Sequence, residues 1–208
     1  MLKARIAVLV SGGGTNLQAL IDAEKSGIIK SGEIELVISS KEGAYALERA
    51  KAAGIKAETV SKKNLKTQEE FENKIKQLLS AEKIDFIVLA GFMSILSGDF
   101  VKAYPERIIN VHPSLIPSFC GKGFYGLRVH EAALNYGVKV TGATVHFVNE
   151  IPDGGRIIAQ KAVEIKEGDT PESLQRRVME QAEWKILPLA AELVSREIAE
   201  KKNAEKEL

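Results

Sequence analysis

The sequence is nearly free of cysteine, which excludes a disulfide-stabilised fold. Cys120 is the only cysteine in 208 residues, so no internal disulfide can form. This is typical of a protein that works in a reducing cytoplasm. A catalytic thiol would need an activating base, and none adjoins Cys120 between Phe119 and Gly121. We therefore expect a cytoplasmic protein whose chemistry does not use this thiol.

Long apolar runs and an excess of one charge are missing as well. The apolar run at Ala4–Val10 is too short for a signal peptide or a membrane helix, and no other run approaches a spanning length. The formal net charge is +1, and the basic cluster of Lys62, Lys63 and Lys66 is followed by acids. We expect no membrane and no nucleic-acid partner. No group of side chains has metal-ligand spacing, so no metal is expected.

What the sequence does contain is an alternation of apolar runs and amphipathic segments. The runs predict strands at 4–10, 34–39, 57–60, 85–91 and 107–112. The amphipathic segments predict helices at 16–27, 44–54, 67–82 and 97–103. Thr67 with a glutamate three residues on has the pattern of a capping box. This repetition predicts a doubly wound, mostly parallel α/β sheet.

The last third of the chain has a different pattern. Two longer strands are predicted at 140–148 and 155–165, as an antiparallel pair added to the sheet. A long C-terminal helix is predicted from about Pro171 to about Lys201, and Pro188 is a place where it could bend. The charged tail 201–208 is expected to fray. With no linker and no repeat, residues 1–208 are interpreted as one domain.

Three unusual stretches follow predicted strands, where open parallel sheets bind ligands. The first, SGGGTN at Ser11–Asn16, opens a helix, so its N–H groups and the helix dipole suit a phosphate. A tight turn capped by Thr15 or Asn16 is the alternative. Leu17 replaces the third glycine of a dinucleotide fingerprint, and no Gly-Lys-Ser/Thr follows. A sugar monophosphate therefore fits better than NAD or ATP.

The second stretch is AGFMSILS and the third is NVHPS. In NVHPS, Asn110 and His112 alternate with apolar residues and so share one face of their strand. An amide beside an imidazole can stabilise an oxyanion and move a proton, although both side chains could also be structural. Downstream, the turn PDGG projects Asp153, which could orient His112 and raise its pKa. An ordinary turn is again the alternative.

The other two histidines are interpreted as structural. His130 lies in the helical stretch RVHEAAL and His146 in the strand TVHFV. Neither has a converging partner in the sequence.

Five stretches in this order carry a family resemblance: SGGGTNLQALI, VLAGFMSILS, INVHPSLIPSF, TGATVHFV and DGG followed by IIAQ. From Ile6 to about Leu189 the chain resembles the phosphoribosylglycinamide formyltransferase family. HPSL with a downstream DGG is shared by the wider 10-formyltetrahydrofolate superfamily, whereas SGGGTN is narrower. The resemblance implies transfer of a formyl group from the co-substrate 10-formyltetrahydrofolate to the amine of glycinamide ribonucleotide, in de novo purine synthesis.

The resemblance also implies roles for individual residues. The residues that match the catalytic trio are Asn110, His112 and Asp153. Those that match the ribonucleotide site are Gly14, Thr15 and Asn16 at the phosphate, and Glu183 at the glycinamide end. Those that match the folate site are Gln68, Met93, Ser94, Ile95, Leu96 and Asn110.

The chain departs from the family at three positions and leaves alternatives open. The family commonly has arginine where Ser94 stands and often where Gln68 stands, and proline is usual at Cys120. One rival is a formyltetrahydrofolate deformylase, which usually carries an extra N-terminal domain for which a strand beginning by Ala4 leaves no room. A non-enzymatic folate- or nucleotide-binding module and a sugar-nucleotide formyltransferase are the others. Either a monomer or a homodimer is compatible with the sequence.

Overall fold

The first apolar run forms an interior strand of the sheet. All but one residue of β1 (Ala4–Val10) is buried, and β1 pairs in parallel with β2 (Gly32–Ser39) on one side and β4 (Phe86–Leu89) on the other. The remaining strands are β3 (Lys56–Thr59), β5 (Ile108–His112), β6 (Val140–Phe147) and β7 (Ile157–Glu164). The structure, a computed structural model, describes residues 2–206.

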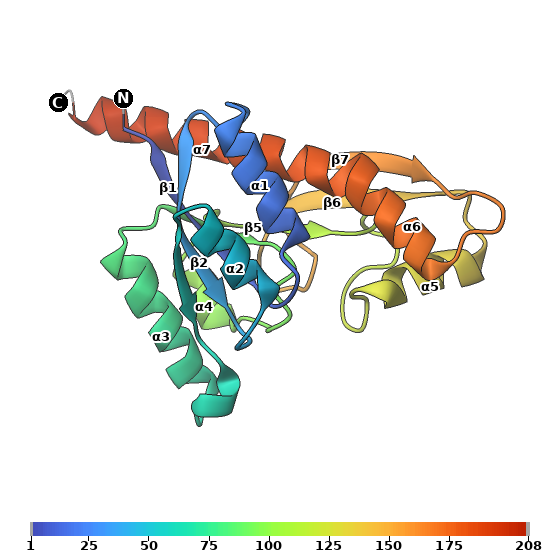
Figure 1. The fold of residues 1–208 in the computed structure, drawn as a ribbon, viewed down its shortest axis with the longest axis horizontal. Helices are drawn as coiled ribbons and strands as arrows, with labels where there is room; N and C mark the ends of the chain where they lie inside the picture. The colour runs from blue at the N-terminus through green and yellow to red at the C-terminus, as the bar shows by residue number, and fades with distance from the viewer. Residues whose placement is uncertain (1, 207–208) are drawn as a thin grey trace.

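The sheet has seven strands in the order β3-β2-β1-β4-β5-β6-β7. In Figure 1, β6 and β7 run beside the long C-terminal helix. The pairs from β3 to β5 are parallel, and β5-β6 and β6-β7 are antiparallel. The predicted doubly wound sheet with an added antiparallel pair is therefore confirmed. Individual strand ends differ by a few residues from the predicted ones.

Helices cover both faces of the sheet and divide the core in two. The helices are α1 (Thr15–Lys25), α2 (Tyr45–Ala52), α3 (Gln68–Ala81), α4 (Gly98–Lys102), α5 (Leu127–Tyr136), α6 (Pro171–Val178) and α7 (Trp184–Lys206), with a 3-10 turn, η1 (Lys62–Asn64). Apolar residues of α1, α2, α6 and α7 pack on one face, and those of α3 and α4 on the other. Fully buried Phe71 of α3 contributes about 1.5–3 kcal/mol to folding.

The predicted start of α3 is confirmed, but only half of its capping box forms. The Thr67 hydroxyl accepts the Glu70 N–H at 3.1 Å, which satisfies one free donor of the first turn. The Glu70 carboxylate accepts from the Lys66 N–H at 2.7 Å and not from that of Thr67. Thr67 is thus the N-cap as predicted, and only the contact of the Glu70 carboxylate lies one residue further out than the pattern predicts.

The long C-terminal helix is interrupted earlier and ends later than predicted. A π-helical segment, η2 (Met179–Glu183), separates α6 from α7. Pro188 lies inside α7, after that interruption. The helix continues to Lys206 and does not end near Lys201, so much of the tail expected to fray is helical. Residues 207–208 of that tail lie outside the described residues.

The two ends of the described chain lie side by side (Figure 1). The Leu2 N–H donates to the side-chain oxygen of Asn203 at 3.0 Å. Among residues 2–206, no helix is both long enough and apolar enough to span a bilayer.

Candidate active site

The sheet brings the three sequence-predicted loops to one edge. Because β1, β4 and β5 are neighbours and parallel, the loops that follow them start at the same edge. The Ser11 hydroxyl accepts the Met93 N–H at 2.8 Å, so the loops after β1 and β4 touch directly. Loops at this edge form the site.

The glycine loop turns its amide hydrogens outward. The carbonyl of Gly12 accepts from the Ala46 N–H at 3.1 Å, and that of Gly13 accepts from the Arg49 side chain at 2.8 Å. In a trans peptide the C=O and N–H groups point in opposite directions, so the next two N–H groups point away from α2. Gly14 has φ +72° and an added Cβ would collide with Ala46, so α2 packs directly against the loop.

The start of α1 is not capped by a side chain. Its N-cap is Gly14, and neither Thr15 nor Asn16 caps the helix, which removes the alternative of a side-chain-capped turn. The Asn16 amide instead donates to Glu183 at 2.7 Å, so the glycine loop is tied to the π-helical segment. Burial raises the pKa of Glu183 to about 6, against the opposing effect of the Asn16 hydrogen bond. The side-chain amide oxygen of Asn16 is buried without a partner in the described residues.

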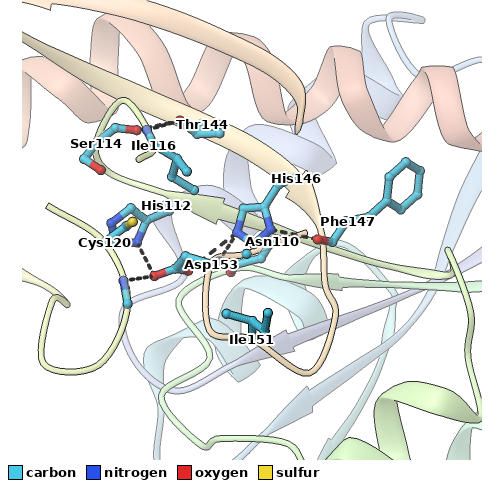
Figure 2. A network of polar contacts seen from close by, with 12 residues as sticks. Asn110, His112, Ser114, Ile116, Cys120, Thr144, His146, Phe147, Ile151 and Asp153 are labelled. Atoms are coloured by element: carbon cyan, nitrogen blue, oxygen red, sulfur yellow. Dashed lines mark hydrogen bonds and ion pairs between the residues drawn. The ribbon is translucent and has the colours of Figure 1, made fainter. Parts of the chain in front are cut away.

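The predicted catalytic trio comes together at the end of β5 (Figure 2). The Nδ1 atom of His112 lies 3.5 Å from a carboxylate oxygen of Asp153. The Nε2 atom of His112 donates to the carbonyl of Phe119, 2.9 Å away. Asn110 lies on the same strand, and its amide is 3.2 Å from Nε2 of His146. The structure thus supports the expectation that this strand end collects polar side chains.

Asp153 reaches His112 because of the backbone of its turn. Asp153 itself has φ +56°, and the Gly121 N–H donates to its carboxylate at 2.8 Å. A Cβ on Gly155 would collide with the carbonyl of Phe147, and one on Gly154 would collide with Ile151. Both glycines are therefore needed for the close approach that brings Asp153 back over the strands.

The loop after His112 closes the site from the other side. The Thr144 hydroxyl donates to the Ser114 carbonyl at 2.7 Å and accepts the Ile116 N–H at 3.1 Å. These contacts from β6 fix the start of the loop, and the Phe119 carbonyl at its far part returns to His112. This closure leaves His112 only 5% exposed.

The expected effect of Asp153, which raises the pKa of His112, is present, but the net shift of this pKa is downward. Burial lowers this pKa, and its effect exceeds the opposite effects of Asp153 and the Phe119 carbonyl. His112 is therefore neutral at pH 7. Burial alone would raise the pKa of Asp153, but its contacts with His146, His112 and the Gly121 N–H together lower it, so Asp153 stays ionised.

His146 belongs to the site, contrary to its interpretation as a histidine without a converging partner. Its Nε2 atom lies 3.5 Å from Asp153, and its Nδ1 atom is 2.8 Å from the carbonyl of Phe147. In the neutral tautomer that donates from Nδ1, Nε2 accepts the amide of Asn110 and so orients that side chain. The only signal for this role is the pairing of β5 with β6, which places His146 opposite Asn110.

Two other residues agree with their structural interpretation. His130 is fully buried, and burial together with nearby His112 lowers its pKa to about 4, so it is neutral. Burial and the charge of Asp153 raise the pKa of the Cys120 thiol, which disfavours the thiolate that a nucleophile needs. Within residues 2–206, no cluster of three or more side chains could hold a metal ion.

The loop after β4 carries the predicted folate-site residues and meets α3. Met93 and Ile95 are 50% and 76% exposed, which is unusual for large apolar side chains. Gln68, at the start of α3, donates its amide to the Ile95 carbonyl at 3.0 Å. Ser94 and Leu96 are half-buried in the same loop. The structure therefore brings Gln68 together with this loop, although the two are far apart in sequence.

Known proteins are similar to this chain in sequence and fold. Residues 4–191 match the formyl transferase family. The phosphoribosylglycinamide formyltransferase of Haemophilus influenzae is 43% identical over 185 residues, 89% of this chain and 84% of that protein. The crystal structure of glycinamide ribonucleotide transformylase 1 from Symbiobacterium toebii superposes with a TM-score of 0.86 at 42% identity, covering 93% of this chain and 88% of that one.

The chain belongs to the phosphoribosylglycinamide formyltransferase family. The resemblance seen in the motifs is therefore confirmed over nearly the whole chain. The trifunctional purine biosynthetic protein adenosine-3 of Homo sapiens is also similar, 48% identical over 193 residues. That match covers 93% of this chain but only 18% of the human protein. A phosphoribosylglycinamide formyltransferase is a transferase, and these relatives give the deformylase alternative no support.

Proposed function

We propose that this protein transfers the formyl group of 10-formyltetrahydrofolate to the amine of N1-(5-phospho-β-D-ribosyl)glycinamide, giving formylglycinamide ribonucleotide in de novo purine synthesis. The observation that carries the proposal is the convergence of Asn110, His112 and Asp153 at one strand end. That strand end shares the sheet edge with an uncapped glycine loop suited to a phosphate. The names of the relatives support the same reaction.

The two substrates approach from different loops. The 5′-phosphate of the ribonucleotide binds at Gly14, Thr15 and Asn16, on the outward N–H groups and the positive end of α1. Glu183, tied to Asn16, contacts the glycinamide end. The folate lies against Met93–Leu96 and beside Gln68, where exposed apolar side chains offer a surface to its ring system.

Formyl transfer needs stabilisation of one developing negative charge. The neutral amine attacks the formyl carbon, and the formyl oxygen gains charge as the carbon becomes tetrahedral. His146 holds the Asn110 amide by one of its two hydrogens, which leaves the other for this oxygen. A preorganised donor of this kind in a buried site is worth about 10²–10³ in rate.

The surroundings of His112 suit it to receive a proton during the reaction. The Phe119 carbonyl and the Asp153 carboxylate are both acceptors, and only the doubly protonated ring can donate to both. The neutral imidazole takes the proton that the attacking amine releases, and Asp153 stabilises the cation. The proton then passes to N10 of the folate as the C–N10 bond breaks, which gives the formylated amine and tetrahydrofolate.

We further propose a cytoplasmic protein that acts, as a monomer or a homodimer, on these two small molecules and needs no metal. A deformylase would use the same trio with water as the acceptor. The glycine loop favours the transferase, since water needs no phosphate site.

The first test incubates the protein with a 10-formyl folate, with and without glycinamide ribonucleotide, and follows the absorbance change of deformylation. We expect loss of the formyl group only when the ribonucleotide is present. Loss at the same rate without the ribonucleotide would replace the proposal with the deformylase. No loss in either case would refute formyl transfer between these two substrates.

A further inference from the structure

A buried carboxylate lies beneath the loop that we place against the folate. Glu72 of α3 is 5% exposed. It accepts the Ser97 N–H at 2.6 Å, the Ser97 hydroxyl at 2.5 Å and the amide of Gln68 at 2.5 Å. Burial alone would raise the pKa of Glu72, but these hydrogen bonds together lower it, so the group stays ionised. A buried charge with this many donors fixes the groups that donate to it.

Gln68 extends this contact to the middle of the loop. Its side-chain amide has two hydrogens, and both are used within the protein: one by Glu72 and one by the Ile95 carbonyl. Gln68 therefore keeps no side-chain N–H for a ligand carboxylate. Its place in the site is that of a support between Glu72 and the loop.

The other end of the loop is also held. The Met93 N–H donates to the Ser11 hydroxyl at 2.8 Å. The ring of Phe92 stacks on buried Phe71, with centroids 6.4 Å apart and planes inclined by 13°. The loop 92–97 is thus fixed at both ends and in the middle, while the side chains of Met93 and Ile95 project from it into solvent. A fixed loop that exposes apolar side chains loses little conformational entropy when a ligand covers it.

We propose that Glu72 is a positioning residue for the folate site: through Gln68 and Ser97 it holds the loop 92–97 in the conformation that receives the folate. This inference rests on the proposed function, because it needs that loop to be the folate wall. Glu72 lies beneath the loop and touches neither substrate. Its loss therefore weakens binding of the folate through the loop, and the reacting atoms stay in place.

The decisive variant is Glu72→Gln, which keeps the size of the side chain. One carboxylate oxygen becomes an amide that cannot accept, so at least one donor from Ser97 or Gln68 loses its partner. We expect KM for the 10-formyl folate to rise about tenfold, the effect of losing one hydrogen bond to a charged group. We expect kcat and the KM for the ribonucleotide to stay unchanged. The control is Glu69→Gln, the same change at an exposed position of the same helix, with all constants unchanged.

A second variant separates positioning from a loss of stability. Gln68→Ala removes the support to the Ile95 carbonyl at the half-buried start of α3, where little of the core is affected. We expect a smaller rise in the folate KM. The double variant should match Glu72→Gln alone, because both changes break one connected network. Circular dichroism melting of each variant verifies that it is folded at the assay temperature.

Any one of four results would overturn the inference. An unchanged folate KM in folded Glu72→Gln would refute it while leaving the proposed function intact. Equal increases in both KM values, or a fall in kcat alone, would make Glu72 a general structural residue. A wild-type protein without saturable dependence on the folate would remove the proposed function, and the inference with it.

Discussion

The parallel and antiparallel halves of the sheet contribute different things to the site. The parallel strands β1 and β4 are almost completely apolar, and what they offer comes from the loops after them. The antiparallel strand β6 carries polar groups within the strand itself, at Thr144 and His146. Backbone donors and an apolar wall thus come from the parallel half, and acid–base side chains gather where β5 meets β6.

The difference follows from how each half is buried. A parallel strand with helices on both faces has no room for an unpaired polar side chain, so polar groups move to its end. At β5 the neighbour on one side is antiparallel, and the turn after β6 comes back to meet it, so polar side chains of the two strands can satisfy one another. The change from parallel to antiparallel pairing at β5 therefore provides the position at which the acid–base side chains meet.

The largest expected effect is at the meeting point of the two halves. His112→Ala and Asp153→Asn should each lower kcat by about 10²–10³-fold or more. Both should leave ribonucleotide affinity nearly unchanged, because the glycine loop belongs to the parallel half. Steady-state kinetics and calorimetric titration of the ribonucleotide measure the two quantities. Turnover like that of the wild type in either variant would refute the mechanism.

The turn between β6 and β7, which carries Asp153, can be distorted by a substitution at one glycine. Gly155→Ala places a Cβ against the Phe147 carbonyl, so the turn must shift and Asp153 with it. We expect the free energy of unfolding to fall by about 1–3 kcal/mol and most turnover to be lost. Gly98→Ala is the matched control, since its Cβ would meet only Glu150 at an ordinary 3.7 Å. Equal denaturation midpoints for the two variants would contradict the argument.

The link between the glycine loop and the last helices predicts a pH effect on stability. The pKa of Glu183 is raised from 4.5 to about 6. Between these values the folded protein holds a proton that the unfolded chain releases, so stability falls as pH rises through this window, by about 2 kcal/mol in all. Glu183→Gln should abolish this loss. Urea unfolding of both proteins at pH 4 and pH 8 tests it, and parallel pH dependence of the two would show the prediction wrong.

The smallest effect is expected from a residue that orients another. His146→Ala frees the Asn110 amide, and kcat should fall about tenfold, the value of one hydrogen bond. In a variant that already carries Asn110→Ala, the same change should cost much less, because its partner is gone. If the losses of kcat from the two single changes simply add in the double variant, His146 does not act through Asn110. Its contact with Asp153 would then be the only one that matters for turnover.

Much of this could be predicted from patterns that need no partner strand. The apolar runs and helical periodicity give the order of elements, and a period of two places Asn110 and His112 on one face. The role of His146 depends on the register between β5 and β6, which no local pattern contains. The lowered pKa of His112 depends on a loop that buries it, and the use of Gln68 depends on a contact with Ile95. These three properties depend on tertiary contacts, so no single segment of the sequence predicts them.

The closeness of the first and last described segments has a consequence for how this fold can be used. Leu2 and Asn203 are hydrogen-bonded to each other. A domain whose ends leave at one point can be inserted into a longer polypeptide by opening a single peptide bond of its host, with little strain on either partner. The human relative, in which the matched part is 18% of the length, is a longer polypeptide that contains a region similar to this chain. The same geometry makes the fold a ready subject for circular permutation, with a short linker across the present ends and new ends at an exposed loop.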